Sequence, residues 1–293
     1  MNKIKRRDTL PYKMITPAMI VTLAIIFIPM FRTIGYSFMN YIVYKPTEVR
    51  YNGFENYKTI FSDPLFYSSL KNTVIWIVGI ITFQFLLGFI TALLLNKRFI
   101  GRGIARSLIL IPWVTPSVIT ALMWRWMYDG NFGLINQILF RLGWIDQFIP
   151  FLADMQLALP SIMFALVWQG FPFFAIMLLA GLQAIPDELY EAARIDGAST
   201  SQQFFRITIP MLKPVILTTL LLRIIWVANS LDVIVVMTAG GPGYSTYTLP
   251  VYSYFKAYKG MDFGYSSALA VLLTILLMII VSGYVRNLLK EER

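Results

Sequence analysis

The chain has 293 residues, of which 57% are hydrophobic and 14% are charged, and its formal net charge is +10. A water-soluble domain is nearer half apolar and a quarter charged, so this composition argues against a soluble protein. Cysteine and histidine are both absent, which excludes a disulfide framework, thiolate metal sites and the commonest general base.

Apolar stretches long enough to cross a bilayer recur along the chain, and a spanning helix needs about 20 residues. We predict six spans, all helical, because an isolated strand would leave its backbone unpaired in lipid. The first is predicted to be retained rather than cleaved as a signal peptide. The spans cover residues 15–38, 73–95, 104–127, 157–182, 214–237 and 266–285. The predicted fold class is therefore all-α, a polytopic membrane helical bundle in a single domain, 1–293.

Basic residues gather on alternate connections between these spans. They are dense at 3–13, 97–106, 194–213 and 286–293, and sparse on the longer segments near 40–70, 129–156 and 238–265. By the positive-inside rule, both termini are predicted to be cytoplasmic. The same rule accounts for the net charge without nucleic acid, and the run 97–106 is interpreted as a topology signal.

Polar residues inside the spans mark a candidate pathway, because an ionised group at mid-membrane costs about 2.5–3.5 kcal/mol or more. Arg223 lies near the middle of the fifth span, and Val227 and Ser230 follow on the same helical face. The third and fourth spans add a second set of candidates: Ser117, Leu166, Gln169, Gly170 and Phe173.

Several of these positions have more than one interpretation. Arg223 either contacts a ligand, for which an acidic sugar or a phosphorylated polyol would suit a guanidinium, or makes a structural contact at a subunit interface. Asp232 is predicted to lie on the opposite face, as a rim or interface residue or else as a gate or ligand contact. Asn229 is predicted to bond between helices. Trp113 is assigned to the interfacial aromatic belt.

The connection 183–213 is long and predicts two short helices. Asp187 is expected to cap the first, and Gly197 to end it in a left-handed conformation. The stretch 200–203 fits a capping box for the second, which Pro210 is expected to stop. The pair either packs beneath the bundle or forms a docking surface for another protein.

This connection carries a recognisable pattern. Glu191-Ala192-Ala193 precedes Gly197 within the stretch 182–198, and Ile209-Pro210 follows. The pattern resembles the EAA signature of ABC importer permeases, and the resemblance covers nearly the whole chain, most strongly with the maltose-type and glycerol-phosphate-type sugar branch. Other matching segments are 53–57, Asp63-Pro64, 101–103, 112–114 and 240–243. The resemblance implies the type I ABC importer permease fold, with a shorter N-terminal portion than the maltose-type prototype.

In that family the signature forms a coupling helix that docks into a groove on a separate ATPase. The resemblance therefore implies ATPase-coupling roles for Glu191, Ala192, Ala193, Arg194, Asp196, Gly197 and Pro210. Maltose-type permeases hold the sugar on the third, fourth and fifth spans. This implies substrate-binding roles for Ser117, Gln169, Gly170, Phe173, Arg223, Val227 and Ser230, of which Ser117 and Gly170 match the family's residue types.

The function implied is that of a permease subunit in a binding-protein-dependent ABC importer of a bacterial or archaeal cell membrane. Such a subunit moves a sugar or oligosaccharide inward by ATP-driven alternating access. The implied partners are a second homologous permease forming a heterodimer, two ATPase subunits and an extracytoplasmic sugar-binding protein. The chain lacks the G-x-x-x-x-G-K-[ST] phosphate loop, so no cofactor is expected on it, and ATP and Mg are expected on the ATPase.

Three other functions remain open at this stage. The same transporter class could carry a polyol phosphate or an acidic sugar. An ion-coupled secondary transporter would usually show internal repeats or an embedded carboxylate relay. An intramembrane enzyme would need a nucleophile, base or metal cluster, which a chain without His and Cys disfavours.

Overall fold

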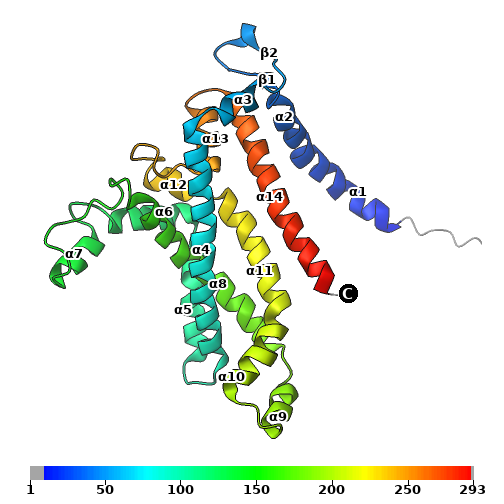
Figure 1. Ribbon diagram of the computed structural model, residues 1–293, viewed down its shortest axis with the longest axis vertical. Helices are drawn as coiled ribbons and strands as arrows, with labels where there is room; N and C mark the ends of the chain where they lie inside the picture. Colours follow the sequence, from blue (N-terminus) through cyan, green and yellow to red (C-terminus); the bar gives the residue numbers. More distant parts are fainter. Residues whose placement is uncertain (1–9, 292–293) are drawn as a thin grey trace, which may run out of the picture. The chain divides into compact units, whose positions relative to one another are not determined.

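The computed structural model describes residues 10–291, and it divides into two compact units (Figure 1). One unit comprises the chain up to Pro64 together with Ser253–Leu276, and the other comprises Leu65–Tyr252 and the chain from Leu277. The basic residues at 3–7 and Arg293, which contributed to the predicted orientation, lie outside the described residues. The single domain 1–293 remains a prediction.

The first unit opens with a long helix built from three pieces. They are α1 (Leu10–Thr22), a π-helical turn (Leu23–Phe27) and α2 (Ile28–Tyr36). The π turn comes just before Pro29, and the Ile28 N–H bonds to the Leu23 carbonyl, five residues back. This wider turn accommodates a proline ring that would otherwise clash with the carbonyl four residues earlier.

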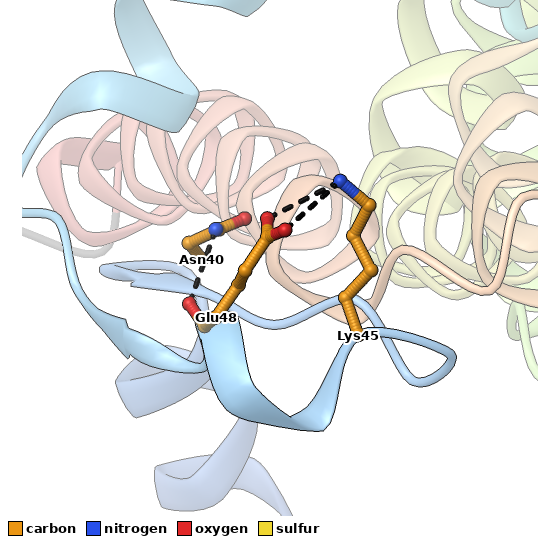
Figure 2. A network of polar contacts seen from close by, with 3 residues as sticks. All are labelled: Asn40, Lys45 and Glu48. Atoms are coloured by element: carbon orange, nitrogen blue, oxygen red, sulfur yellow. Dashed lines mark hydrogen bonds and ion pairs between the residues drawn. The ribbon is translucent and has the colours of Figure 1, made fainter.

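The chain between α2 and Pro64 forms a small loop region of this unit. Strands β1 (Met39–Asn40) and β2 (Arg50–Tyr51) pair antiparallel around a 3₁₀ turn (Pro46–Glu48), and α3 (Glu55–Phe61) follows. Figure 2 shows Lys45 and Asn40 directed toward Glu48. Lys45 Nζ lies 3.2 Å from Glu48 Oε1, and the Asn40 amide donates to the Glu48 carbonyl at 3.2 Å. These exposed contacts order the loop more than they stabilise the fold.

The second unit holds most of the remaining helices. They are α4 (Pro64–Asn96), α5 (Arg102–Val114), α6 (Ser117–Met127), α7 (Leu134–Arg141), α8 (Ala158–Gln183), α9 (Asp187–Ile195), α10 (Thr200–Gln203), a π turn (Phe204–Thr208), α11 (Ile209–Asn229) and α12 (Asp232–Met237). Two further helices, α13 (Leu249–Tyr258) and α14 (Phe263–Glu291), each have residues assigned to both units.

Five helical segments of the described chain are long and apolar enough to cross a membrane, and a sixth is gained if α5 and α6 form one bent span. The five are Tyr12–Tyr36, Pro64–Asn96, Ala158–Gln183, Thr200–Met237 and Phe263–Tyr284. The predicted spans fall within these segments to within a few residues. The third predicted span, 104–127, differs most from the structure. It is not one continuous helix, because α5 and α6 meet at an angle of 92°.

The candidate spans differ in how many of their apolar side chains are buried in protein, as expected of helices that also face lipid. The most apolar stretch of Tyr12–Tyr36 has no buried residue, whereas α8 buries more than half of its corresponding stretch. In α4 the buried side chains recur every three or four residues, among them Trp76, Ile80 and Gln84. One face of α4 therefore packs against protein, and its other face carries exposed apolar side chains such as Val78 and Ile90.

Candidate functional site

A cavity of about 460 Å³ opens within the second unit, where α5, α6, α8, α11 and α12 meet. Six of the seven residues predicted to bind substrate line it: Ser117, Gln169, Gly170, Arg223, Val227 and Ser230. The other lining residues are Trp113, Leu166, Ile225, Trp226, Asn229 and Asp232. The residues that helical spacing placed on shared faces therefore line a single cavity in the structure.

Arg223 is held in this cavity by an amide. Its side chain is 8% exposed, and its Nε and Nη2 atoms donate to Gln84 Oε1 at 3.1 and 2.7 Å. Gln84 in turn donates from Nε2 to the Leu166 carbonyl at 2.6 Å. No carboxylate of a described residue lies within ion-pair distance of the guanidinium. Arg223 is thus hydrogen-bonded, but its charge is not neutralised.

Aromatic rings surround the same guanidinium. Its carbon lies 5.9 Å from the ring centroids of both Phe173 and Trp226, within the range of a cation–π interaction. Phe173 also packs against Trp113 and Trp226, with centroid distances of 5.9 and 5.2 Å. Phe173 does not itself line the cavity. It packs behind the lining residues Trp113 and Trp226 and supports them.

Gly170 is required by close packing. A Cβ atom at this position would lie 2.0 Å from Gln84 Nε2 and 2.3 Å from Arg223 Nη2. Both are shorter than any real Cβ contact, so an alanine would displace one end of the pair. Gly170 therefore leaves the space in which Gln84 and Arg223 meet.

The bend between α5 and α6 is stabilised by Gln169. Helix α5 ends before Thr115, whose backbone is extended, and Pro116 precedes α6. The Gln169 amide donates to the Thr115 carbonyl at 2.9 Å. Gln169 therefore bonds a backbone group released by the break, and part of its hydrogen-bonding capacity is already used.

A second break changes the predicted position of Asp232. Helix α11 ends at Asn229 and α12 begins at Asp232, so the helical spacing that placed Asp232 on the opposite face does not continue across Ser230. Its carboxylate instead lines the cavity and accepts a short hydrogen bond from the Ser117 hydroxyl of α6. The assignment of Asp232 to the opposite face was wrong.

The end of α11 is secured from α4. Trp76 donates from Nε1 to the Val227 carbonyl at 3.1 Å and to Ser230 Oγ at 3.2 Å. Ser230 also donates to the Val227 carbonyl at 2.8 Å. The Asn229 amide bonds to the Ile225 carbonyl of its own helix rather than to a neighbouring helix, which corrects the predicted interhelical role.

A second candidate surface lies at the end of this unit where α9 and α10 are found (Figure 1). No residue of α9 is buried, and Ile195 is 87% exposed. Ala193, Asp196 and Gly197 line a groove of about 360 Å³ with the end of α10 and the π turn. The Tyr190 hydroxyl lies 2.9 Å from the Thr208 hydroxyl and ties α9 to that turn.

The other predicted coupling residues are placed differently. Glu191, Ala192 and Arg194 are exposed on α9, and Arg194 donates from Nε to the Tyr190 carbonyl at 3.3 Å. Pro210 lies in the first turn of α11 and is not part of the groove. The structure therefore gathers most of this set on α9 and separates Pro210 from it.

Three local expectations for this connection need correction, and one is confirmed. Pro186 rather than Asp187 occupies the cap position of α9, and the capping box joins Ser199 to Gln202, one residue earlier than predicted. Pro210 does not stop the helix, because the π turn before it widens the backbone, as in α2. Gly197 has φ +80°, the left-handed conformation expected of it.

Sequence reasoning missed the lining residues Trp113, Ile225 and Trp226, and it missed Gln84, which bonds to Arg223 without lining the cavity. Gln84 was not singled out, although it interrupts a long apolar run of the second predicted span, and a buried amide in lipid requires a partner. Trp113 was assigned to the interfacial belt and instead lines the cavity, as does Trp226. Nothing in the local sequence distinguishes these two tryptophans from interfacial ones.

Comparison with known proteins identifies a family. Residues 84–292 match the model of the family described as binding-protein-dependent transport system inner membrane component. The trehalose/maltose transport system permease protein of Thermococcus litoralis is 39% identical over 94% of this chain and 93% of its own. The sulfoquinovosyl glycerol transport system permease protein of Agrobacterium fabrum is 36% identical over 93% and 88%.

A solved structure has the same fold. The chain superposes, with a TM-score of 0.83, on a chain from the crystal structure of a bacterial ABC transporter involved in the import of the acidic polysaccharide alginate. The match covers 96% of each chain at 24% sequence identity. The helical arrangement is therefore that of an ABC importer permease, which confirms the predicted fold class.

Proposed function

This chain belongs to the family of binding-protein-dependent transport system inner membrane components, and from that membership we propose that it carries a sugar or oligosaccharide into the cell. The observation that carries the proposal is the cavity between α5, α6, α8, α11 and α12, which contains a buried cation, hydroxyl groups and two tryptophans. The same observation supports substrate-binding roles for the residues predicted above.

The chemistry of the cavity suits a carbohydrate. Ser117, Asn229 and Ser230 offer hydroxyl and amide groups to sugar hydroxyls, and Trp113 and Trp226 offer flat apolar surface to sugar C–H faces. Relatives named for trehalose/maltose and for sulfoquinovosyl glycerol support this substrate class.

Arg223 favours a narrower candidate, an acidic sugar or a polyol phosphate. No described carboxylate neutralises it, and a ligand carboxylate, sulfonate or phosphate would provide a counter-charge. One relative is named for a sulfonated sugar glycoside, and the structural neighbour for an acidic polysaccharide. Asp232, which lines the same cavity, already accepts a hydrogen bond from Ser117.

Arg223→Met separates the neutral and the acidic substrate. Uptake would be measured in proteoliposomes containing the complete transporter and its binding protein, with a neutral disaccharide and a uronate oligosaccharide. For an acidic substrate, loss of one charge-assisted contact should lower uronate uptake about tenfold or more. Arg125→Met, which removes an exposed cation outside the cavity, is the matched control. An unchanged ratio between the two ligands would leave Arg223 with a structural role.

The transport class has its own test. We expect uptake to require ATP, a separate ATPase bearing Mg and ATP, and the external binding protein. Ligand uptake by the purified chain alone, in liposomes without an ATPase, would instead support an ion-coupled secondary transporter.

Helix α9 is proposed to be the element that couples this chain to the ATPase. Its exposed residues Glu191, Ala192 and Arg194, together with the groove residues Asp196 and Gly197, offer small side chains and charges to a protein partner. A second permease of the same family would supply the other coupling helix, because two ATPase subunits need two. ATP-driven closure of the ATPase pair would then move α8 and α11, which flank α9 and also line the cavity.

Both termini and α9 are proposed to face the cytoplasm. The chain contains no cysteine, so single cysteines can report sidedness without background. Glu188→Cys on α9 should be labelled only from the cytoplasmic side, and Glu48→Cys in the loop between β1 and β2 only from outside. Labelling of both from the same side would refute this orientation.

A further inference from the structure

Two arginines on α5 converge on a single neutral oxygen at the end of the second unit where α9 lies. With its carboxamide oxygen turned toward them, Gln183 accepts hydrogen bonds from Arg106 Nη2 at 2.7 Å and from Arg102 Nη2. Arg102 and Arg106 are four residues apart and share a face of α5. Gln183 is the last residue of α8.

This arrangement leaves two positive charges uncompensated. No described carboxylate lies within ion-pair distance of either guanidinium, and the first turn of α5 contains no acidic residue. Arg102 is the first residue of α5, where the helix dipole opposes a positive charge. Because both Nη2 atoms approach one oxygen, the two charges lie close together and repel each other.

The hydrogen-bond donors of Arg102 and Arg106 suit a ligand that has more oxygen atoms than an amide. An arginine offers Nε–H and Nη2–H side by side, as a fork that matches two oxygens of one anion. Here each fork uses only Nη2, while Nε of Arg102 and of Arg106 is buried without a hydrogen-bond partner. A buried donor without a partner is unfavourable, because it has lost its hydrogen bonds to water. A phosphate group has enough oxygens to accept from both forks.

We propose that Arg102, Arg106 and Gln183 form a binding site for a phosphate group, and that anionic lipid headgroups supply it. Helix α5 begins at Arg102 and continues into an apolar stretch that forms, with α6, the bent candidate span. Its first turn therefore lies at the depth of a membrane interface, where lipid phosphates are concentrated. In the absence of the phosphate the Gln183 oxygen accepts from both arginines, and when the phosphate binds the carboxamide turns so that its N–H donates to it.

The site would act on α5 and α8 together. A bound headgroup would join the start of α5 to the end of α8, next to the connection that leads into α9. Anionic lipid would therefore stabilise the relative position of the two helices that flank the cavity at their other ends. This inference does not depend on the identity of the transported substrate.

The test uses the complete transporter in neutral detergent, with phosphatidylglycerol, phosphatidylcholine and inorganic phosphate as probes. Bound lipid is measured by native mass spectrometry, and thermal stability is measured in parallel. Phosphatidylglycerol should be retained and should raise Tm, and phosphatidylcholine should do neither. Arg102→Gln/Arg106→Gln should reduce phosphatidylglycerol retention about tenfold or more, since two charge-assisted contacts are lost.

Two further variants keep the test decisive. Arg98→Gln removes an exposed cation just before α5 and should retain the lipid as the wild type does. Gln183→Glu supplies a carboxylate in place of the phosphate, so it should raise Tm without lipid and remove the further rise with phosphatidylglycerol. This variant gives a result even if the double arginine variant does not fold.

The outcomes separate the two phosphate sources. A Tm rise with inorganic phosphate that is lost in the double arginine variant would support the phosphate site, with free phosphate as its ligand. Equal phosphatidylglycerol retention by the wild type and the double arginine variant would overturn the proposal. So would an equal loss in Arg98→Gln, because the effect would then reflect general basic charge.

Discussion

Replacing Gln84 with Met should destabilise the protein more than the small difference in side-chain volume suggests. Met fills nearly the same volume, so the main loss is the oxygen that accepts from Arg223 at 3.1 and 2.7 Å. Hydrogen bonds to a charged group contribute about 1.5–3 kcal/mol each. The rings of Phe173 and Trp226 contact the guanidinium before and after the change, so they do not alter this difference. Both bonds share one acceptor oxygen, so we take the lower end of the range. We expect the free energy of unfolding to fall by about 3 kcal/mol.

The partner variant and the double variant make this a test of coupling. Arg223→Met leaves Gln84 Oε1 without its donor and should cost about 1–3 kcal/mol. With both replaced, neither polar group is left unsatisfied, so the double variant should be more stable than Gln84→Met alone. The expected coupling energy is about 3 kcal/mol, at the upper end of the range found for residues in contact.

Thermal unfolding of the purified transporter in detergent provides the assay. Gln84→Met should have the lowest Tm, and Arg223→Met and the double variant should both lie above it, close to each other. Gln137→Met is the matched control, because this amide is exposed and bonds only locally, to the Phe132 carbonyl. Additive Tm losses in the double variant would refute the pairing on which the description of the cavity rests.

Three further substitutions test the rest of the site. Gly197→Val forces a branched side chain into a left-handed backbone, at about 1–2 kcal/mol, and should lower uptake per ATP hydrolysed. Gly197→Asn, which tolerates that conformation, should not, and equal effects would contradict the coupling role. Gln169→Leu should lower Tm, because the Thr115 carbonyl at the bend loses its donor. Gln169→Glu should lower Tm as much, since a carboxylate has no N–H to donate. An unchanged Tm in both variants would show that this hydrogen bond does not stabilise the bend. Ser117→Ala and Asp232→Ala should change uptake equally and non-additively, and additive effects would mean that their contact is incidental.

Hydropathy and helical spacing were sufficient to predict the helices and one face of the cavity. Six apolar stretches predicted the spans, and spacing on the fourth and fifth placed Gln169, Gly170 and Arg223 on surfaces that the structure brings together. Gly197 was predictable because few other residues adopt a left-handed backbone at a helix end. These features depend on local chemistry that a single segment contains.

The remaining features depend on partners distant in sequence. Gln84 bonds Arg223, 139 residues away, and no local pattern could pair them. Asp232 was misplaced because helical spacing was extended across a break that begins after Asn229. The polar run Asn229-Ser230 was the available signal, since such side chains compete with the helix for backbone hydrogen bonds.

Both interrupted helices break at the wall of the same cavity, and this follows from the membrane. A released backbone carbonyl in lipid needs a donor from protein or from a water-filled space. The Thr115 carbonyl receives Gln169 from α8, and the Val227 carbonyl receives Trp76 from α4. Each break is thus stabilised by a side chain from another helix, so the breaks and the packing of the bundle depend on each other. A motion that separated α4 from α11, or α8 from α5, would expose these carbonyls, and it could occur at low cost only with water or a polar ligand in the cavity. The hydroxyl groups of a sugar are ligands of that kind, so opening of the bundle and occupation of the cavity should be energetically linked.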